Sequence, residues 1–221
     1  AAAQEWKPDR AVEIVATNAP GGGSDRIGRI MIKILQDNRY VPTPINLVNK
    51  PGGGSSIAYN YINLQPGNGH LLVMGSRSLI TNHISGHGPS YTELTPVVRL
   101  FDEYIAVTVK PVSPIRTGQD LISFMKRDPT ALSFGIATSL GAPNHSGVAA
   151  PFKAAGIDLK KMKNVIFASG GAASTALMGG HVDVVPISVA FAACLLRNGQ
   201  VRLIAVTSPQ RLPGILKDVP T

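Results

Sequence analysis

The chain has 221 residues, of which 44% are hydrophobic and 15% are charged, enough for one large or two small domains with a buried core. These proportions exclude a disordered chain, and no apolar run approaches the roughly 20 residues of a membrane span. The net charge of +8 suits anionic partners, but aromatic residues make up only 5%, so we expect no nucleic-acid partner. The densest basic cluster is Lys160, Lys161 and Lys163, which we expect in a solvated loop.

The first residues, Ala1 to Gln4, resemble what signal peptidase leaves when it cleaves behind small residues. A cytosolic chain or a cloning remnant is the alternative. The single cysteine, Cys194, lies in the apolar run 189–196, where we expect a buried and inert thiol.

In the first part of the chain, short apolar runs alternate with segments whose apolar residues have the spacing of a helix. Strands are predicted at residues 11–16, 45–48 and 71–74, with a short helix at 55–64 between the last two. The longer helix after the first strand carries an apolar stripe formed by Ile27, Ile30, Met31, Ile34 and Leu35. This βαβαβ order predicts a parallel sheet with helices on its faces.

The same alternation returns from residue 105 onward. The expected strands are 105–109, 132–136, 165–168, 182–185 and 201–207. The expected helices are 118–126, which Thr117 caps, 145–155, 172–178 and 189–197. We therefore expect two α/β lobes, residues 1–103 and 104–221. The chain stops just after a strand with no helix to cover the sheet, so we expect that a C-terminal segment completing the first lobe is missing.

Two glycine-rich turns are the most informative feature: Pro-Gly-Gly-Gly-Ser-Asp at residues 20–25 and Pro-Gly-Gly-Gly-Ser-Ser at residues 51–56. Glycine takes positive φ and lets a ligand approach the backbone, and a helix start offers N–H groups and partial positive charge. A third turn, Ser-Gly-Gly, occupies residues 169–171. Ligands of open α/β sheets bind where such turns lie, so the turns predict a clamp for a small carboxylate.

The turns do not match nucleotide-binding or hydrolase motifs. Neither has the lysine of a phosphate-binding loop, and Arg26 occupies the position of the third Rossmann glycine. No Gly-x-Ser-x-Gly elbow occurs, and Ser24 and Ser55 have no base at a defined spacing. We expect both serines to cap helices, which is compatible with hydrogen bonds to a ligand. We therefore expect no catalytic residue, no cofactor and no metal.

Three other side chains leave alternatives open. Asp25 either caps the helix or selects the ligand by accepting a hydrogen bond from a hydroxyl, amide or ammonium group. His145 is either a helix-start residue bonded to the backbone or part of the pocket wall. His83 and His87 have metal-compatible spacing, but nearby glycine and proline residues argue against a helix and a zinc site there.

At these motifs the chain resembles the periplasmic substrate-binding receptors of tripartite tricarboxylate transporters, also called Bug-type receptors, over residues 6–221. The signature PGGxxD, with an arginine on the next helix, is matched at residues 20–25 and Arg29. The signature N-[RK]-PG-x-G-G/S is matched at residues 49–55. Further matches follow in the family's order at Asp120-Leu121, Asp128-Pro129, 132–135, His145, 155–158, 179–183 and 218–221.

The resemblance implies the α/β fold of a type II periplasmic binding protein, with mostly parallel sheets flanked by helices in two lobes that close like a Venus flytrap. It implies a monomeric periplasmic protein, its signal peptide removed, that captures a small carboxylate between the lobes for membrane transporter subunits. The alternatives are an enzyme acting on a small anionic substrate on a two-lobe scaffold, and a ligand-sensing partner of a signalling receptor.

The turns and the resemblance together predict the ligand-binding residues. They are Asn18, Pro20, Gly21, Gly22, Gly23, Ser24, Asp25, Gly53, Gly54, Ser55, Ser76, Thr138, Ser139, His145, Ser169, Gly170, Gly171, Ala172 and Ser188. Receptors of this family usually have an aromatic or apolar residue at position 18 and a proline at position 17. Asn18 and Thr17 here predict a more polar rim, which favours a hydroxylated or nitrogen-bearing carboxylate.

Overall fold

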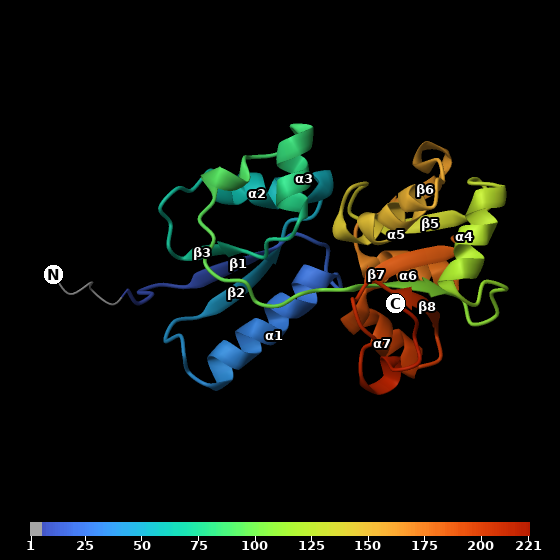
Figure 1. Ribbon diagram of the computed structural model, residues 1–221. Helices are drawn as coiled ribbons and strands as arrows, with labels where there is room; N and C mark the ends of the chain where they lie inside the picture. The colour runs from blue at the N-terminus through green and yellow to red at the C-terminus, as the bar shows by residue number, and fades with distance from the viewer. Residues whose placement is uncertain (1–5) are drawn as a thin grey trace. The chain divides into compact units, whose positions relative to one another are not determined.

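The computed structural model describes residues 6–221, which form two compact units (Figure 1). The first unit ends at Thr95 and the second begins at Pro96. In each unit a β-sheet carries helices on both of its faces (Figure 1). The residues of the expected signal-peptidase remnant lie outside the described residues.

The first unit is built on a three-stranded parallel sheet with the order β2-β1-β3. Its strands are β1 Val12–Ala16, β2 Ile45–Asn49 and β3 Leu71–Val73. Helix α1 (Gly23–Asp37) covers one face, and α2 (Ser56–Asn63) and α3 (Ser78–Ser85) cover the other (Figure 1). The parallel sheet predicted from the βαβαβ order is confirmed.

The second unit has a five-stranded sheet with the order β6-β5-β7-β4-β8. Its strands are β4 Ile105–Val109, β5 Ser133–Ala137, β6 Lys163–Phe167, β7 Val184–Ser188 and β8 Arg202–Val206. Its helices are α4 Gly118–Arg127, α5 Pro143–Ala154, α6 Gly170–Met178 and α7 Val189–Arg197. Strand β5 is parallel to β6 and β7, whereas β4 is antiparallel to β7 and β8.

The two faces of the second sheet bury separate cores. Side chains of α6 and α7, including Leu177 and Leu195, pack on one face, and those of α4 and α5, including Met125 and Phe152, pack on the other. The predicted cap of α4 is confirmed, since the Thr117 side chain accepts the Asp120 N–H at 3.0 Å and the Asp120 carboxylate accepts the Thr117 N–H at 3.0 Å.

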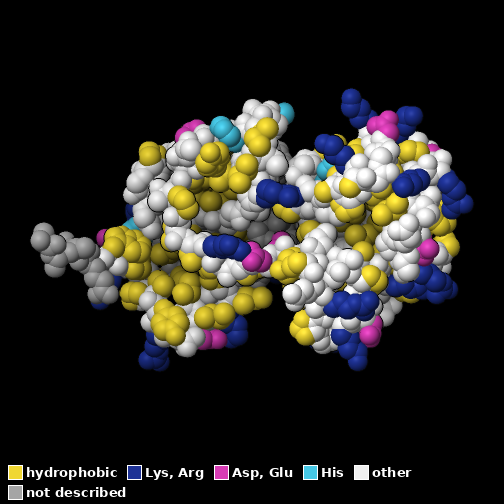
Figure 2. All heavy atoms as spheres, viewed as in Figure 1, with side chains coloured by type: hydrophobic (Ala, Val, Ile, Leu, Met, Phe, Trp, Pro, Cys, Tyr) yellow, Lys and Arg dark blue, Asp and Glu magenta, His cyan; other side chains and the backbone are white. Residues whose placement is uncertain are grey.

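The core of the first unit is smaller. Its buried cluster consists of Val12, Ile14 and Ile45, with partly buried side chains around it. On α1, the apolar stripe expected from the sequence is only partly covered, because Ile30 and Ile34 remain exposed. Hydrophobic side chains accordingly gather on the surface of this unit around α1, at the lower left of the space-filling view (Figure 2).

Three predictions of local structure are wrong. Cys194 is exposed rather than buried, because α7 turns Ala192 and Leu195 toward the core and Cys194 outward. Helix α3 was not predicted, yet it places His83 on a helix, which ends at Ser85 with Gly86 as its C-cap, before His87. Strand β7 covers Val184–Ser188 instead of 182–185, since the turn at Gly179 and Gly180 extends further than expected.

The basic cluster predicted as a solvated loop is solvated. Lys160, Lys161 and Lys163 are all exposed. Lys160 and Lys161 lie in a short 3-10 helix, Leu159–Lys161, whereas Lys163 begins the edge strand β6 rather than lying in a loop.

Candidate functional site

The first glycine turn joins the carboxyl end of β1 to α1. Gly21 has a φ of 79°, and α1 begins at Gly23 with Gly22 as its N-cap, without a side-chain capping bond. The prediction that Ser24 or Asp25 caps this helix is therefore wrong, because both lie inside its first turn. Ser24 instead closes the loop onto Asn18: its N–H donates to Asn18 Oδ1 at 3.0 Å, and its Oγ accepts the Asn18 N–H at 3.1 Å.

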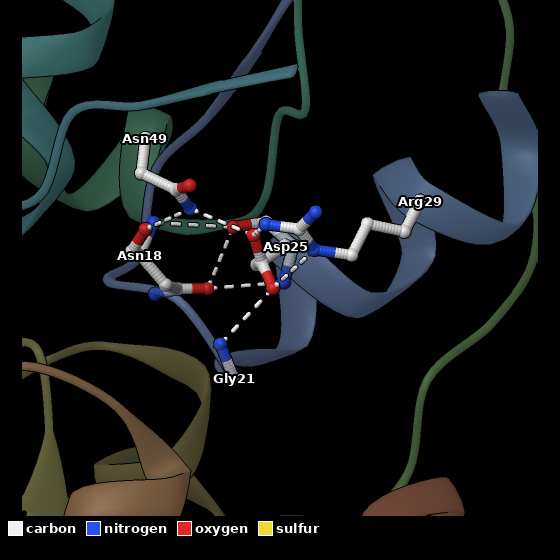
Figure 3. Close-up of polar contacts among 6 residues, drawn as sticks. Asn18, Gly21, Asp25, Arg29 and Asn49 are labelled. Carbon is white, nitrogen blue, oxygen red and sulfur yellow. Dashed lines mark hydrogen bonds and ion pairs between the residues drawn. The ribbon is translucent and has the colours of Figure 1, made fainter.

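Asp25 is the centre of the polar network behind this turn (Figure 3). Its side chain is 3% exposed. Oδ2 accepts the Gly21 N–H at 3.0 Å and Arg29 Nε at 3.1 Å, while Oδ1 accepts Arg29 Nη2 and Asn49 Nδ2, each at 3.0 Å. Both carboxylate oxygens are thus engaged by donors of the protein itself.

These contacts set the charge state of Asp25. Burial alone raises the pKa of its carboxyl, but the bonds from Arg29, Gly21 and Asn49 outweigh burial and lower the pKa below its ordinary value. The carboxylate is therefore ionised and paired with Arg29. This pairing compensates the negative charge that would otherwise repel an anion at the start of α1.

The second glycine turn follows β2 and has an unusual backbone. Gly52, Gly53, Gly54 and Ser55 have φ values of 116°, 55°, 63° and 80° in succession. Gly53–Ser55 forms a short 3-10 helix before α2, and Asn82 Nδ2 of α3 donates to the Gly54 carbonyl at 2.9 Å. Ser55 occupies the N-cap position of α2 but makes no side-chain capping bond, so its predicted capping role is wrong.

The third strand-to-helix junction of the first unit carries a chain of hydroxyl groups. The Ser76 N–H donates to the Tyr59 hydroxyl at 3.2 Å, and Tyr59 lies 3.0 Å from Ser78 Oγ. The Ser76 and Ser78 Oγ atoms are 2.7 Å apart. Ser76 is exposed at the end of this chain, whereas Tyr59 and Ser78 are buried.

In the second unit, the loop between β5 and α5 holds two of the predicted residues, Thr138 and Ser139. Thr138 has a φ of 68°, which is rare for a β-branched residue, and its N–H donates to the Phe167 carbonyl at 2.8 Å. Gly141 has a φ of 83°, and its N–H donates to His145 Nδ1 at 3.1 Å. Ser139 accepts the Ala142 N–H with its carbonyl at 3.3 Å.

His145 is half-buried, and burial lowers its pKa. Because Nδ1 accepts a hydrogen bond, the neutral ring carries its proton on Nε2. The hypothesis that His145 is a helix-start residue bonded to backbone is thus met by the contact with Gly141, although α5 begins two residues earlier, at Pro143.

The remaining predicted residues of the second unit lie at two further helix starts. Ser169 is buried and caps α6, since its Oγ accepts the Ala172 N–H at 3.2 Å. The turn Gly170 to Ala172 forms the beginning of that helix. Ser188 ends β7 and directly precedes α7.

Every predicted ligand-binding residue therefore lies where a strand ends and a helix begins. The structure joins Asn18, Ser24 and Asp25 in one network. Sequence reasoning assigned no role to Asn49 or Asn82, which hold the first and second turns. Asn49 is the first residue of the second signature, and that position was a signal for its role. Asn82 had no such signal, because it lies in α3, which was not predicted.

Other features of the described residues do not coincide with these turns. A shallow surface depression of about 550 Å³ lies between α1 and β2, lined by Arg29, Lys33 and Leu47 among others, and contains none of the predicted residues. Within residues 6–221, no three His, Cys, Asp or Glu side chains gather as a metal site. None of the described helices has both the length and the apolar character that crossing a membrane requires.

Comparison with known proteins identifies relatives of the whole chain. The family model described as "Tripartite tricarboxylate transporter family receptor" matches residues 33–221. A UPF0065 protein from the tcbD-tcbE intergenic region of Pseudomonas sp. (strain P51) is 26% identical over 97% of this chain and 62% of its own length. The chain spans less than two thirds of the length of the curated relatives it matches.

Solved structures show the same fold. MatC (Rpa3494) from Rhodopseudomonas palustris with bound malate superposes with a TM-score of 0.85 at 22% identity, covering 97% of this chain and 72% of MatC. R. palustris Rpa4515 with adipate has a TM-score of 0.78 at 21% identity, covering 97% of this chain and 71% of Rpa4515. These comparisons confirm the resemblance inferred from the two signatures and the periplasmic-binding-protein fold.

Proposed function

Because this chain belongs to the receptor family of tripartite tricarboxylate transporters, we propose that it is a non-catalytic solute receptor of the periplasm. It binds a small carboxylate at its strand-to-helix turns and delivers it to membrane transporter subunits. It acts as a monomer after removal of its signal peptide. The alternative of an enzyme or a signalling partner would use the same turns.

The observation that carries this proposal is the set of strand-to-helix turns, in a chain of this family. A carboxylate at such turns is held by backbone N–H groups and by the partial positive charge of the helix starts, so no lysine or arginine has to contact it. Three of the four positive-φ positions of the second turn, Gly52, Gly53 and Gly54, are glycines, so no side chain there keeps a ligand away from the backbone.

The pairing of Asp25 with Arg29 supports the same ligand class. A free carboxylate at the start of α1 would repel an anion, but here its charge is paired and both of its oxygens accept bonds from the protein. Asn18 and Ser24 at the same turn are polar, which favours a carboxylate that also carries a hydroxyl or nitrogen group. The structural relatives bind malate and adipate, two small carboxylates.

The direct test is a binding screen of the ligand-stripped protein by thermal shift and calorimetry. The panel contains acetate, malate, adipate, citrate, aspartate and benzoate. A ligand at 100 times its dissociation constant adds about 2.7 kcal/mol to stability, which is a clear rise in melting temperature. We expect a sharp rise for one class of aliphatic carboxylates. Turnover of a small anionic substrate without carboxylate binding would overturn the proposal.

A further inference from the structure

The β1–α1 loop of the first unit and the β5–α5 loop of the second share one turn geometry from the glycine before the helix onward. In the first unit β1 lies between β2 and β3, and in the second β5 lies between β6 and β7, with parallel pairing throughout. The central strand is followed by a glycine with a φ of 79° at Gly21 and 83° at Gly141. In both loops the helix begins two residues after that glycine, at Gly23 and at Pro143.

The turn hydrogen bonds of the two loops also correspond. The residue after the glycine donates its N–H to the carbonyl three residues earlier: Gly22 to Ala19 at 3.0 Å, and Ala142 to Ser139 at 3.3 Å. The glycine itself donates to the side chain four residues later. Gly21 N–H donates to Asp25 Oδ2 at 3.0 Å, and Gly141 N–H donates to His145 Nδ1 at 3.1 Å.

Asp25 and His145 thus occupy the same position relative to the glycine of two similar turns, although an acidic side chain and an imidazole share no obvious sequence signal. What they have in common is an acceptor atom that reaches back to the glycine. At the glycine's positive φ, its N–H points into the loop, and the side-chain acceptor satisfies that donor locally. At the helix starts the Ser24 N–H donates to Asn18 Oδ1 and Pro143 has no N–H, so the N–H groups of Gly23, Asp25, Asn144 and His145 are left for a ligand.

We propose that Asp25 and His145 are equivalent positioning residues, each of which holds its βα loop in shape by accepting the N–H of the glycine four residues earlier. Neither needs to contact the ligand: each acts through the backbone that does. For its effect on ligand affinity the proposal rests on the proposed function, whereas its effect on the loop does not.

The test uses two substitutions of His145 in the full chain. His145→Asn supplies an amide oxygen that can accept the Gly141 N–H, as the Asp25 carboxylate does for Gly21. His145→Leu keeps a side chain of similar bulk but has no acceptor. His181→Asn, at an exposed histidine of the same unit, is the control for loss of an imidazole.

The first measurement needs no ligand: amide hydrogen exchange of Gly141, followed by NMR. We expect Gly141 to exchange at least tenfold faster in His145→Leu and within about threefold of the wild type in His145→Asn, because only the leucine removes the acceptor. The Gly21 amide in the other unit should not change. Unaltered Gly141 exchange in His145→Leu would overturn the proposal.

The second measurement is affinity by calorimetry, with malate and adipate as probes. We expect His145→Leu to weaken binding about tenfold and His145→Asn to restore it to within about threefold, a rescue that a direct ring contact would not give. Equal losses in both variants would show that the ring itself binds the ligand and would contradict the positioning role. If the wild type binds neither these probes nor any acid of the panel, the proposed function fails, while Gly141 exchange still decides this inference.

Discussion

The β1–α1 loop of the first unit and the β5–α5 loop of the second have the same turn geometry but are held by different chemistry. The Gly21 N–H donates to a carboxylate that three further donor atoms, from Arg29 and Asn49, also engage. The Gly141 N–H donates to a half-buried imidazole whose pKa is lowered by burial. The comparison teaches that the same turn can be held by a carboxylate or by an imidazole, because each presents an acceptor atom to the glycine N–H.

The hydrophobic cores of the two units also differ, and here the second unit is the more extensively stabilised. The second unit has five strands and two buried core clusters, whereas the first has three strands and one small cluster. The first unit therefore depends more on its polar network and the second more on packing. Four tests, three by substitution and one by pH, would break or sharpen this comparison.

The largest effect is expected for Asp25→Ala. This substitution leaves the Gly21 N–H, Asn49 Nδ2 and the Arg29 guanidinium without their shared acceptor, which we expect to cost about 2–3 kcal/mol of unfolding free energy. The single tryptophan, Trp6, lies in the first unit, so its fluorescence during urea unfolding reports this loss.

The matched control is Asp37→Ala on the same helix. Asp37 pairs with Lys33 at the same four-residue spacing, 2.7 Å apart, but on the surface. An exposed pair of this kind contributes little, so we expect no measurable change. Equal losses for the two substitutions would contradict the view that the buried network stabilises the first unit.

The next largest effect is expected for Gly147→Ala, which tests how tightly the second unit is packed. A methyl group at Gly147 would lie 2.9–3.0 Å from the Cγ2 and Cβ atoms of Ile105, which are fixed to the sheet. We expect Gly147→Ala to lower the free energy of unfolding by about 1–2 kcal/mol, because overpacking outweighs the gain in helix propensity. Urea unfolding followed by circular dichroism measures this change.

Gly28 in α1 provides the counterpart in the first unit. Its added methyl would meet mainly Leu47 Cδ1, at 2.6 Å, and this half-buried side chain can move aside. We expect Gly28→Ala to be neutral or slightly stabilising. A cost as large as that of Gly147→Ala would show that the first unit is packed as tightly as the second.

A smaller effect, this time a rise in the free energy of unfolding, is expected from replacing non-glycine residues that have positive φ. Thr138 at 68° and Ser55 at 80° are strained, and a β-branched residue is the more strained of the two. We expect Thr138→Gly to raise the free energy of unfolding by about 0.5–1 kcal/mol and Ser55→Gly by less. Arg39→Gly, at 55° beyond the end of α1, is the control outside the predicted site. No gain from Thr138→Gly would argue against stored strain at this loop.

The smallest effect is a difference in pH dependence between the loops. The His145 pKa is lowered from its ordinary value of 6.5, so below pH 6.5 the unfolded chain binds more protons and this group makes folding less favourable. The Asp25 pKa is lowered from 3.8, so its stabilising contribution is kept above pH 3.8 and is lost as the pH falls through the folded value. Between pH 7 and 4, NMR should show the Gly141 amide shifting while the Gly21 amide stays constant. A shift of both amides over the same pH range would remove this distinction.

Local signals predicted much of the fold. The apolar runs placed β1, β2, β4 and α7 to within a residue or two at each end, because strand and helix periodicities are properties of neighbouring residues. Thr117 with Asp120 was recognisable as a helix start for the same reason. Helix α3 was missed because its residues Ser78–Ser85 have weak intrinsic helix preference, and its place depends on packing against the second glycine turn.

The sequence by itself determined the family, the α/β class and the positions of the glycine turns, since each depends on short motifs that any chain with these residues would show. Only the tertiary structure decided what those residues do. It brought Asn49 of one strand to Asp25 of a helix, 24 positions apart, and so turned a candidate ligand selector into the centre of an internal network. It also made Asp25 and His145 counterparts, because equivalence of two loops depends on backbone geometry and not on residue type.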